Sequence, residues 1–112
     1  MKDLLVVCLC AAWCKACNEF RGTFDRLAQS DPSAQFVWLD IEDESALVGE
    51  LEVENFPTLA VFRGATPLFY GVTMPQEGVV ARTLASIKRD DREPISVPGE
   101  IAALPEALSA RL

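Results

Sequence analysis

The 112-residue sequence contains no histidine, which removes the commonest nitrogen ligand of metal sites and the usual base of Cys–His and Ser–His catalysis. It has only four cysteines, and all of them lie within residues 8–17, whereas a disulfide scaffold spreads its cysteines along the chain. No apolar run reaches the roughly 18–20 residues that a membrane-spanning helix needs. The sequence therefore predicts neither an imidazole-based site nor a membrane span.

Positive charge is also scarce, because 10 Lys and Arg residues stand against 17 Asp and Glu residues, giving a net charge of −7. This balance argues against nucleic acid and anionic membrane surfaces as partners. Half of the residues are hydrophobic, so one domain of this length can form a core without disulfides.

The first 13 residues, MKDLLVVCLCAAW, loosely resemble a secretion signal, with a lysine, a short apolar core and small residues. However, the leading segment carries an acid and the apolar run is short. Cleavage would also remove a segment that the following helix needs for packing. We therefore expect the protein to act in the cytoplasm.

The hydrophobic pattern predicts a small α/β domain. The continuous apolar run Leu4–Cys10 is typical of a parallel strand that is covered on both faces. The other expected elements are an amphipathic helix over 14–28, a strand over 36–41, a short helix over 42–51, a hairpin of strands 58–62 and 67–70, and a helix over 75–89. The order β-α-β-α-β-β-α predicts a four-stranded mixed sheet with helices on both faces.

A proline-punctuated connector over 89–100 and a last helix over 105–112 are expected to follow. We expect residues 1–90 to form the domain, and residues 91–112 to pack on it or on a partner. Residues 35–41 are expected to form an exposed sheet edge, which natural proteins usually cover. The tail residues Ile101, Leu104, Leu108 and Leu112, or a second copy of the chain in a homodimer, could cover that edge.

Cys14 and Cys17 form a CxxC pair behind Trp13, in the segment AAWCKAC. If a helix begins near Cys14, the unpaired N–H groups and the dipole of its first turn stabilise a thiolate there, and Lys15 adds a neighbouring cation. Cys17 lies three residues on, on the same helical face and deeper, so that one sulfur can attack and the other can resolve. This arrangement predicts a dithiol that exchanges with disulfides.

The sequence resembles the thioredoxin family over about residues 3–90. The AAWCKAC segment matches the family's tryptophan-CxxC signature, and the segment NFPT at 55–58 falls where the family has its cis-proline loop. Residues 70–72, YGV, resemble the glycine-containing loop after the hairpin. The resemblance implies a minimal thioredoxin-like fold and a thiol–disulfide oxidoreductase.

The same resemblance implies roles for individual residues. Cys14 is expected to be the nucleophile and Cys17 the resolving thiol, with Lys15 stabilising the thiolate. The Phe56–Pro57 bond is expected to be cis and to face the dithiol, with the backbone of Phe56 pairing with a bound peptide. The implied partners are protein disulfides and an external reductase or electron donor, and no prosthetic group is needed. The expected docking residues are Trp13, Ala16, Phe56, Gly71 and Val72.

The sequence also departs from the family pattern. It lacks the leading strand and helix of the standard form, and Lys15-Ala16 stands where the reducing members have glycine-proline. The family's buried acid aligns with Cys8, and the lysine that often accompanies it aligns with Trp38. Proton transfer from Cys17 is therefore left to water or to a carboxylate that the sequence does not identify.

Three alternatives stay open. Cys8 and Cys10 are expected to be packing residues, but Cys8, lying beneath Cys17, could serve as a third redox thiol. All four sulfurs could bind zinc, or Cys14 could share an iron–sulfur cluster between two chains. The domain could also be a non-enzymatic module for protein binding or redox sensing.

Overall fold

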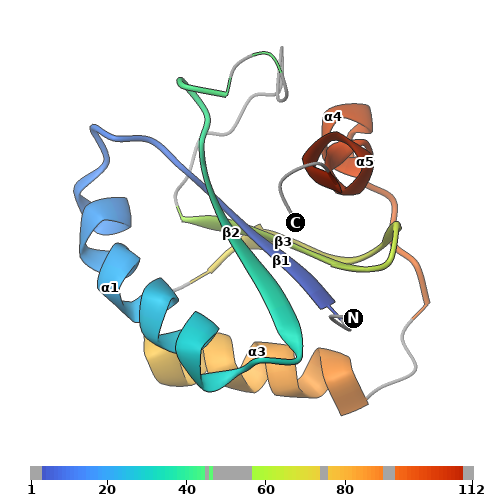
Figure 1. The fold of residues 1–112 in the computed structure, drawn as a ribbon, viewed down its shortest axis with the longest axis horizontal. Coiled ribbons are helices and arrows are strands. Elements are labelled where there is room, and N and C mark those ends of the chain that lie inside the picture. The colour runs from blue at the N-terminus through green and yellow to red at the C-terminus, as the bar shows by residue number, and fades with distance from the viewer. Residues whose placement is uncertain (1–3, 45, 47–56, 74–75, 90–92, 110–112) are drawn as a thin grey trace.

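The protein is described here by a computed structural model that covers residues 4–44, 46, 57–73, 76–89 and 93–109 (Figure 1). Four strands and four helices are assigned in these ranges. In chain order they are β1 (Leu4–Cys10), α1 (Lys15–Ser30), β2 (Ala34–Asp40), β3 (Thr58–Arg63), β4 (Thr66–Val72), α3 (Glu77–Arg89), α4 (Gly99–Ala102) and α5 (Leu104–Leu108).

Strand β1 lies inside a four-stranded sheet of order β2-β1-β3-β4. It pairs in parallel with β2, to which it is connected through α1, and antiparallel with β3. All seven of its residues are buried, which fits its unbroken run of leucine, valine and cysteine. The mixed sheet and the parallel β1–α1–β2 crossover confirm the fold class that the sequence predicts.

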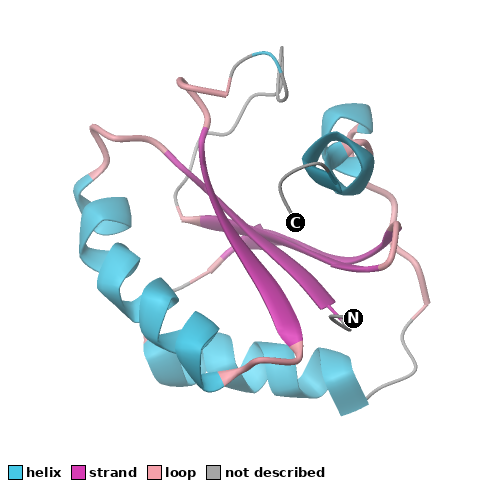
Figure 2. Ribbon diagram, in the orientation of Figure 1, coloured by secondary structure: helices cyan, strands magenta, loops and turns pink. Residues whose placement is uncertain are grey.

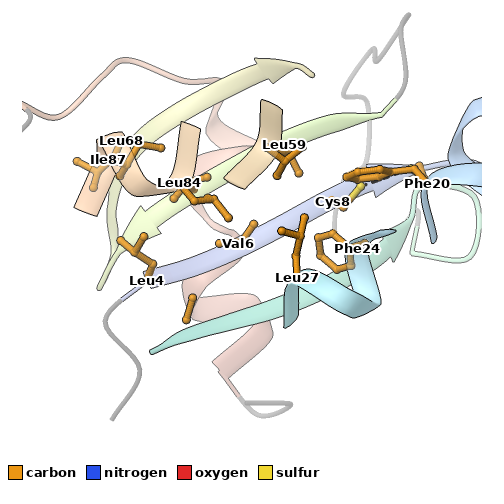
Figure 3. Close-up of a cluster of buried hydrophobic side chains, with 14 of the residues drawn as sticks. Leu4, Val6, Cys8, Phe20, Phe24, Leu27, Leu59, Leu68, Leu84 and Ile87 are labelled. Carbon is orange, nitrogen blue, oxygen red and sulfur yellow. Dashed lines mark hydrogen bonds between the residues drawn. The ribbon is translucent and has the colours of Figure 1, made fainter. Parts of the chain in front are cut away.

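The two faces of β1 pack against different helices (Figures 1 and 2). Successive side chains of a strand point to opposite faces, so alternate residues of β1 belong to two separate hydrophobic clusters. Leu4, Val6, Cys8 and Cys10 pack with α1 and α3, and Figure 3 shows Cys8 continuing the row that Leu4 and Val6 begin. The opposite cluster unites β1 and β3 with the C-terminal helices through Leu5, Val7, Leu9, Ala60, Phe62, Ile101, Leu104 and Leu108.

The C-terminal segment differs from its prediction in two ways. Helix α4 spans the end of the predicted connector and the two residues after it, where no helix was predicted, and Pro98 precedes its first turn. Pro105 does stand in the first turn of α5, as expected. The tail residues Ile101, Leu104 and Leu108 also cover a face of the sheet that extends across β1 and β3 to Leu39 of β2, and not the β2 segment alone, because the apolar side chains on that face need a cover. Leu112 lies outside the described residues.

The element ends are shifted by a few residues elsewhere. Strand β2 begins two residues earlier than predicted, and β4 extends from Thr66 to Val72. The hairpin turn is correspondingly tight, with Gly64 at a φ of 62°, a conformation that favours glycine. The helix predicted over 42–51 falls mostly outside the described residues. Within those residues, no helix has both the length and the hydropathy that crossing a bilayer requires.

We predict that Leu104→Ala destabilises the whole domain. Leu104, at the start of α5, is fully buried in the cluster that joins the tail to the sheet, and truncating such a leucine typically costs about 2–5 kcal/mol of unfolding free energy. The measurement is denaturant unfolding followed by circular dichroism. Ala102→Ser, at an exposed position of α4, serves as the control. Equal stability of the two variants would show that the tail does not contribute to the core.

Candidate active site

Cys14 stands at the junction between strand β1 and helix α1. It is the residue before the first helical turn, with extended backbone angles and no side-chain hydrogen bond capping the helix. Its N–H donates to the carbonyl of Ala11 at 3.0 Å, and the Asn18 side chain donates to the carbonyl of Ala12 at 3.0 Å. These bonds hold the short loop in place. A half-buried sulfur thus lies where helix N–H groups favour an anion.

Cys17 lies one turn further along α1 and is fully buried. Burial raises the pKa of its thiol, and hydrogen bonding with Cys10 and Cys14 raises it further, against a smaller opposing effect from the backbone of Ala11. The pair therefore combines one accessible sulfur with one sheltered sulfur. Their roles as nucleophile and resolving thiol remain predictions.

The hydrogen bonding from β1 that raises the pKa of Cys17 comes from Cys10, whereas the sequence-based hypothesis considered Cys8 as the sulfur beneath Cys17. The reason is that Cys10 ends β1, next to the loop, while Cys8 lies two residues deeper along the same face. The Cys8 and Cys10 sulfurs are 3.6 Å apart. This hydrogen bond is the main cause that raises the pKa of Cys10, followed by burial. The sequence does indicate that Cys8 and Cys10 are neighbours, since residues two apart on a strand point to the same face.

The positions aligned with the family's acid and lysine are neighbours here. Cys8 lies beside Trp38 in the register of β1 and β2. Trp38 packs edge-on against Phe24 at 5.5 Å between ring centroids, and the Arg21 guanidinium lies 4.7 Å from its ring. A thiol and an aromatic cluster thus occupy the place of a charged pair. In the described ranges, no three metal-ligating side chains are grouped to hold a metal ion.

Lys15 points into solvent beside the first turn of α1. Its side chain is 90% exposed, and its ammonium lies 3.9 Å from a carboxylate oxygen of Glu19. That partner offsets part of its charge, so its expected effect on a thiolate at Cys14 remains a prediction.

The expected docking residues are only partly described. Trp13 and Val72 are exposed hydrophobic side chains, at 69% and 55%, and Ala16 and Gly71 are half-buried. Pro57 is buried, and its carbonyl accepts the N–H of Thr73 at 3.0 Å. The pairing of β1 with β3 ends at Leu9 and Thr58, the residues directly next to Cys10 and Pro57 in the chain. Phe56 lies outside the described residues, so the cis bond and the peptide-pairing backbone stay predictions.

Comparison with known proteins gives consistent matches in sequence and fold. The protein-family model Thioredoxin matches residues 1–87. Protein disulfide-isomerase A4 of Bos taurus is 27% identical over 85 residues, which make up 72% of this chain and 13% of that protein. The thioredoxin of Echinococcus granulosus is 28% identical over 78 residues, 69% of this chain and 73% of that protein.

A solved structure of a thioredoxin from Trypanosoma brucei brucei superposes with a TM-score of 0.67 at 26% identity, covering 80% of this chain and 79% of that one. This chain thus spans a small part of the disulfide-isomerase and most of the two thioredoxins. The family-model match over residues 1–87 includes the CxxC segment and all four assigned strands.

We predict that iodoacetamide labels Cys14 far faster than the other three thiols in the reduced, folded protein. Cys8, Cys10 and Cys17 have exposures of 0–1%, whereas Cys14 reaches the surface. Because the pKa values of Cys10 and Cys17 are raised, their slow labelling should still accelerate above pH 10. Mass spectrometry of each peptide measures this, with unfolded protein as the control. Equal labelling of Cys14 and Cys17 at pH 7 would contradict the structure.

Proposed function

This chain belongs to the thioredoxin family of thiol–disulfide oxidoreductases, and we propose that it exchanges a Cys14–Cys17 dithiol with the disulfides of other proteins. The observation that carries the proposal is the pairing of a half-buried sulfur at a helix start with a buried sulfur one turn later. Neither a metal nor a prosthetic group takes part in this chemistry.

The first step is attack by the Cys14 thiolate on one sulfur of the substrate disulfide. A mixed disulfide forms between Cys14 and the substrate, and the other substrate sulfur leaves as a thiolate. The α1 N-terminus favours the attacking anion, since its first N–H groups have no side-chain cap. The exposed faces of Trp13 and Val72 offer apolar contact to an extended peptide around the disulfide.

The second step is attack by Cys17 on Cys14, which releases the reduced substrate. Burial holds the pKa of Cys17 high, and so does its hydrogen bonding with Cys10 and Cys14. Once Cys14 is part of the mixed disulfide, the thiol hydrogen bonding between Cys14 and Cys17 that raises the pKa of Cys17 is lost. The attack by Cys17 is thereby favoured after the substrate has bound, and not before. An external electron donor then returns the Cys14–Cys17 disulfide to the dithiol.

The test is the rate at which dithiothreitol reduces a protein disulfide in the presence of this protein. We expect Cys14→Ser to return that rate to the uncatalysed level. Cys17→Ser should instead accumulate a mixed disulfide with the substrate on Cys14, visible by mass spectrometry. Cys8→Ala is the control, since it removes a buried sulfur that this mechanism does not use.

A different outcome would favour a non-enzymatic module. If the wild-type dithiol oxidises reversibly in glutathione buffers but does not accelerate substrate reduction, the domain senses redox state without catalysing exchange. That result would remove the proposed enzymatic function while leaving the fold and the family intact.

A further inference from the structure

Two buried sulfurs are not used by the mechanism above. Cys8 and Cys10 lie on the face of β1 that α1 covers, and their sulfurs are 3.6 Å apart. Cys17 belongs to the same buried cluster, against which Cys14 packs, and hydrogen bonding between Cys10 and Cys17 affects the pKa of both thiols. The four sulfurs therefore form one group, in which Cys8, Cys10 and Cys17 are buried and Cys14 alone is half-buried.

We propose that Cys10 is a third redox residue. In the oxidised protein it exchanges with the Cys14–Cys17 disulfide and forms a Cys10–Cys17 disulfide in the core. This inference rests on the proposed exchange chemistry of Cys14 and Cys17. It adds a second oxidised form, in which a Cys10–Cys17 disulfide is sheltered and Cys14 is a free thiol at the surface.

The step is an internal thiol–disulfide exchange and needs no further oxidant. The Cys10 sulfur attacks the Cys17 sulfur, so the Cys10–Cys17 bond forms as the Cys14–Cys17 bond breaks. The electron pair of the broken bond leaves on Cys14, which can take up the proton that Cys10 loses. The number of disulfides is the same before and after.

The surroundings of the three sulfurs favour the inner disulfide at equilibrium. Exchange favours release of the thiol whose anion is best stabilised, and Cys14 is the one at an uncapped helix N-terminus. Cys10, in contrast, is buried in an apolar cluster in which a neutral disulfide sulfur is well accommodated and a thiolate is not.

Cys8 is a poorer disulfide partner for Cys10 than Cys17 is. Residues two apart on a regular strand have Cα atoms roughly 6.6–6.8 Å apart, at the upper limit for disulfides. Cys17 approaches Cys10 from a different element, α1, so no such strand spacing is imposed on that pair. Cys8 is therefore the matched control, equally buried on the same strand face.

The exchange should be slow near neutral pH and faster at high pH. The hydrogen bond with Cys8 and burial both raise the pKa of Cys10, while Cys17 lowers it and Cys14 raises it again. Asp40 is the register neighbour on β2, but its carboxylate already accepts the N–H groups of Glu42 and Asp43. Because the thiolate attacks, the exchange rate should rise about tenfold per pH unit.

The decisive experiment uses the full chain with Cys14→Ser, which leaves Cys17 without its usual partner. The protein is equilibrated across a glutathione redox series at pH 8.5, quenched with acid, alkylated after unfolding and mapped by mass spectrometry. We expect an intramolecular Cys10–Cys17 disulfide to form at a definite potential. It should persist when Cys8→Ala is added and disappear when Cys10→Ala is added.

Two results would overturn the inference. One is that the Cys14→Ser chain keeps Cys10 and Cys17 as thiols at every potential. The other is that the disulfide forms in the variant carrying Cys10→Ala and involves Cys8. Failure of the proposed function is a separate observation, namely that the wild-type chain with all four cysteines does not reduce a protein disulfide.

Discussion

Seven consecutive buried residues make β1 the strand on which the rest of the domain depends. A strand without a polar face must be packed against other elements on both faces. Helices α1 and α3 cover one face of β1, and α4 and α5 cover the other. The same strand carries two of the four sulfurs and ends one short loop before the third. The packing requirement and the candidate chemistry therefore share one segment, and a change in either affects the other.

The site also shows what replaces a buried charge in this fold. With Cys8 and Trp38 at the positions of the family's acid and lysine, the region beneath Cys17 holds thiols and aromatic rings. Burying such a region costs little desolvation free energy, because it contains no ion. It is also poor at accepting a proton. The proton that Cys17 loses must then pass to water or to another group, since the neighbouring Cys10 is itself a thiol of raised pKa.

Much of this arrangement could be predicted from the sequence, because it depends on local patterns. The bounds of β1 follow from its apolar run, and the place of Cys14 at a helix start follows from the strand before it and the amphipathic pattern after it. Helix α4 was missed because the surrounding prolines suggest a break. The hydrogen bonding between Cys10 and Cys17 was not predicted, since it depends on how deep α1 sits against the end of β1, which no local pattern gives. The predicted role of Phe56 lies outside the described residues.

The burial of β1 has a consequence for local motion. Its N–H groups are paired on both sides, with β2 and β3, and are shielded by both helical layers. Amides of this kind exchange with deuterium only when the whole domain opens, whereas the loop that carries Trp13 and Cys14 is exposed and can open by itself. The boundary between the segment that opens only with the whole domain and the segment that can open locally falls between Cys10 and Cys14. By this argument Cys8 and Cys10 lie in a segment that opens only with the whole domain, and Cys14 lies in a loop that can open locally.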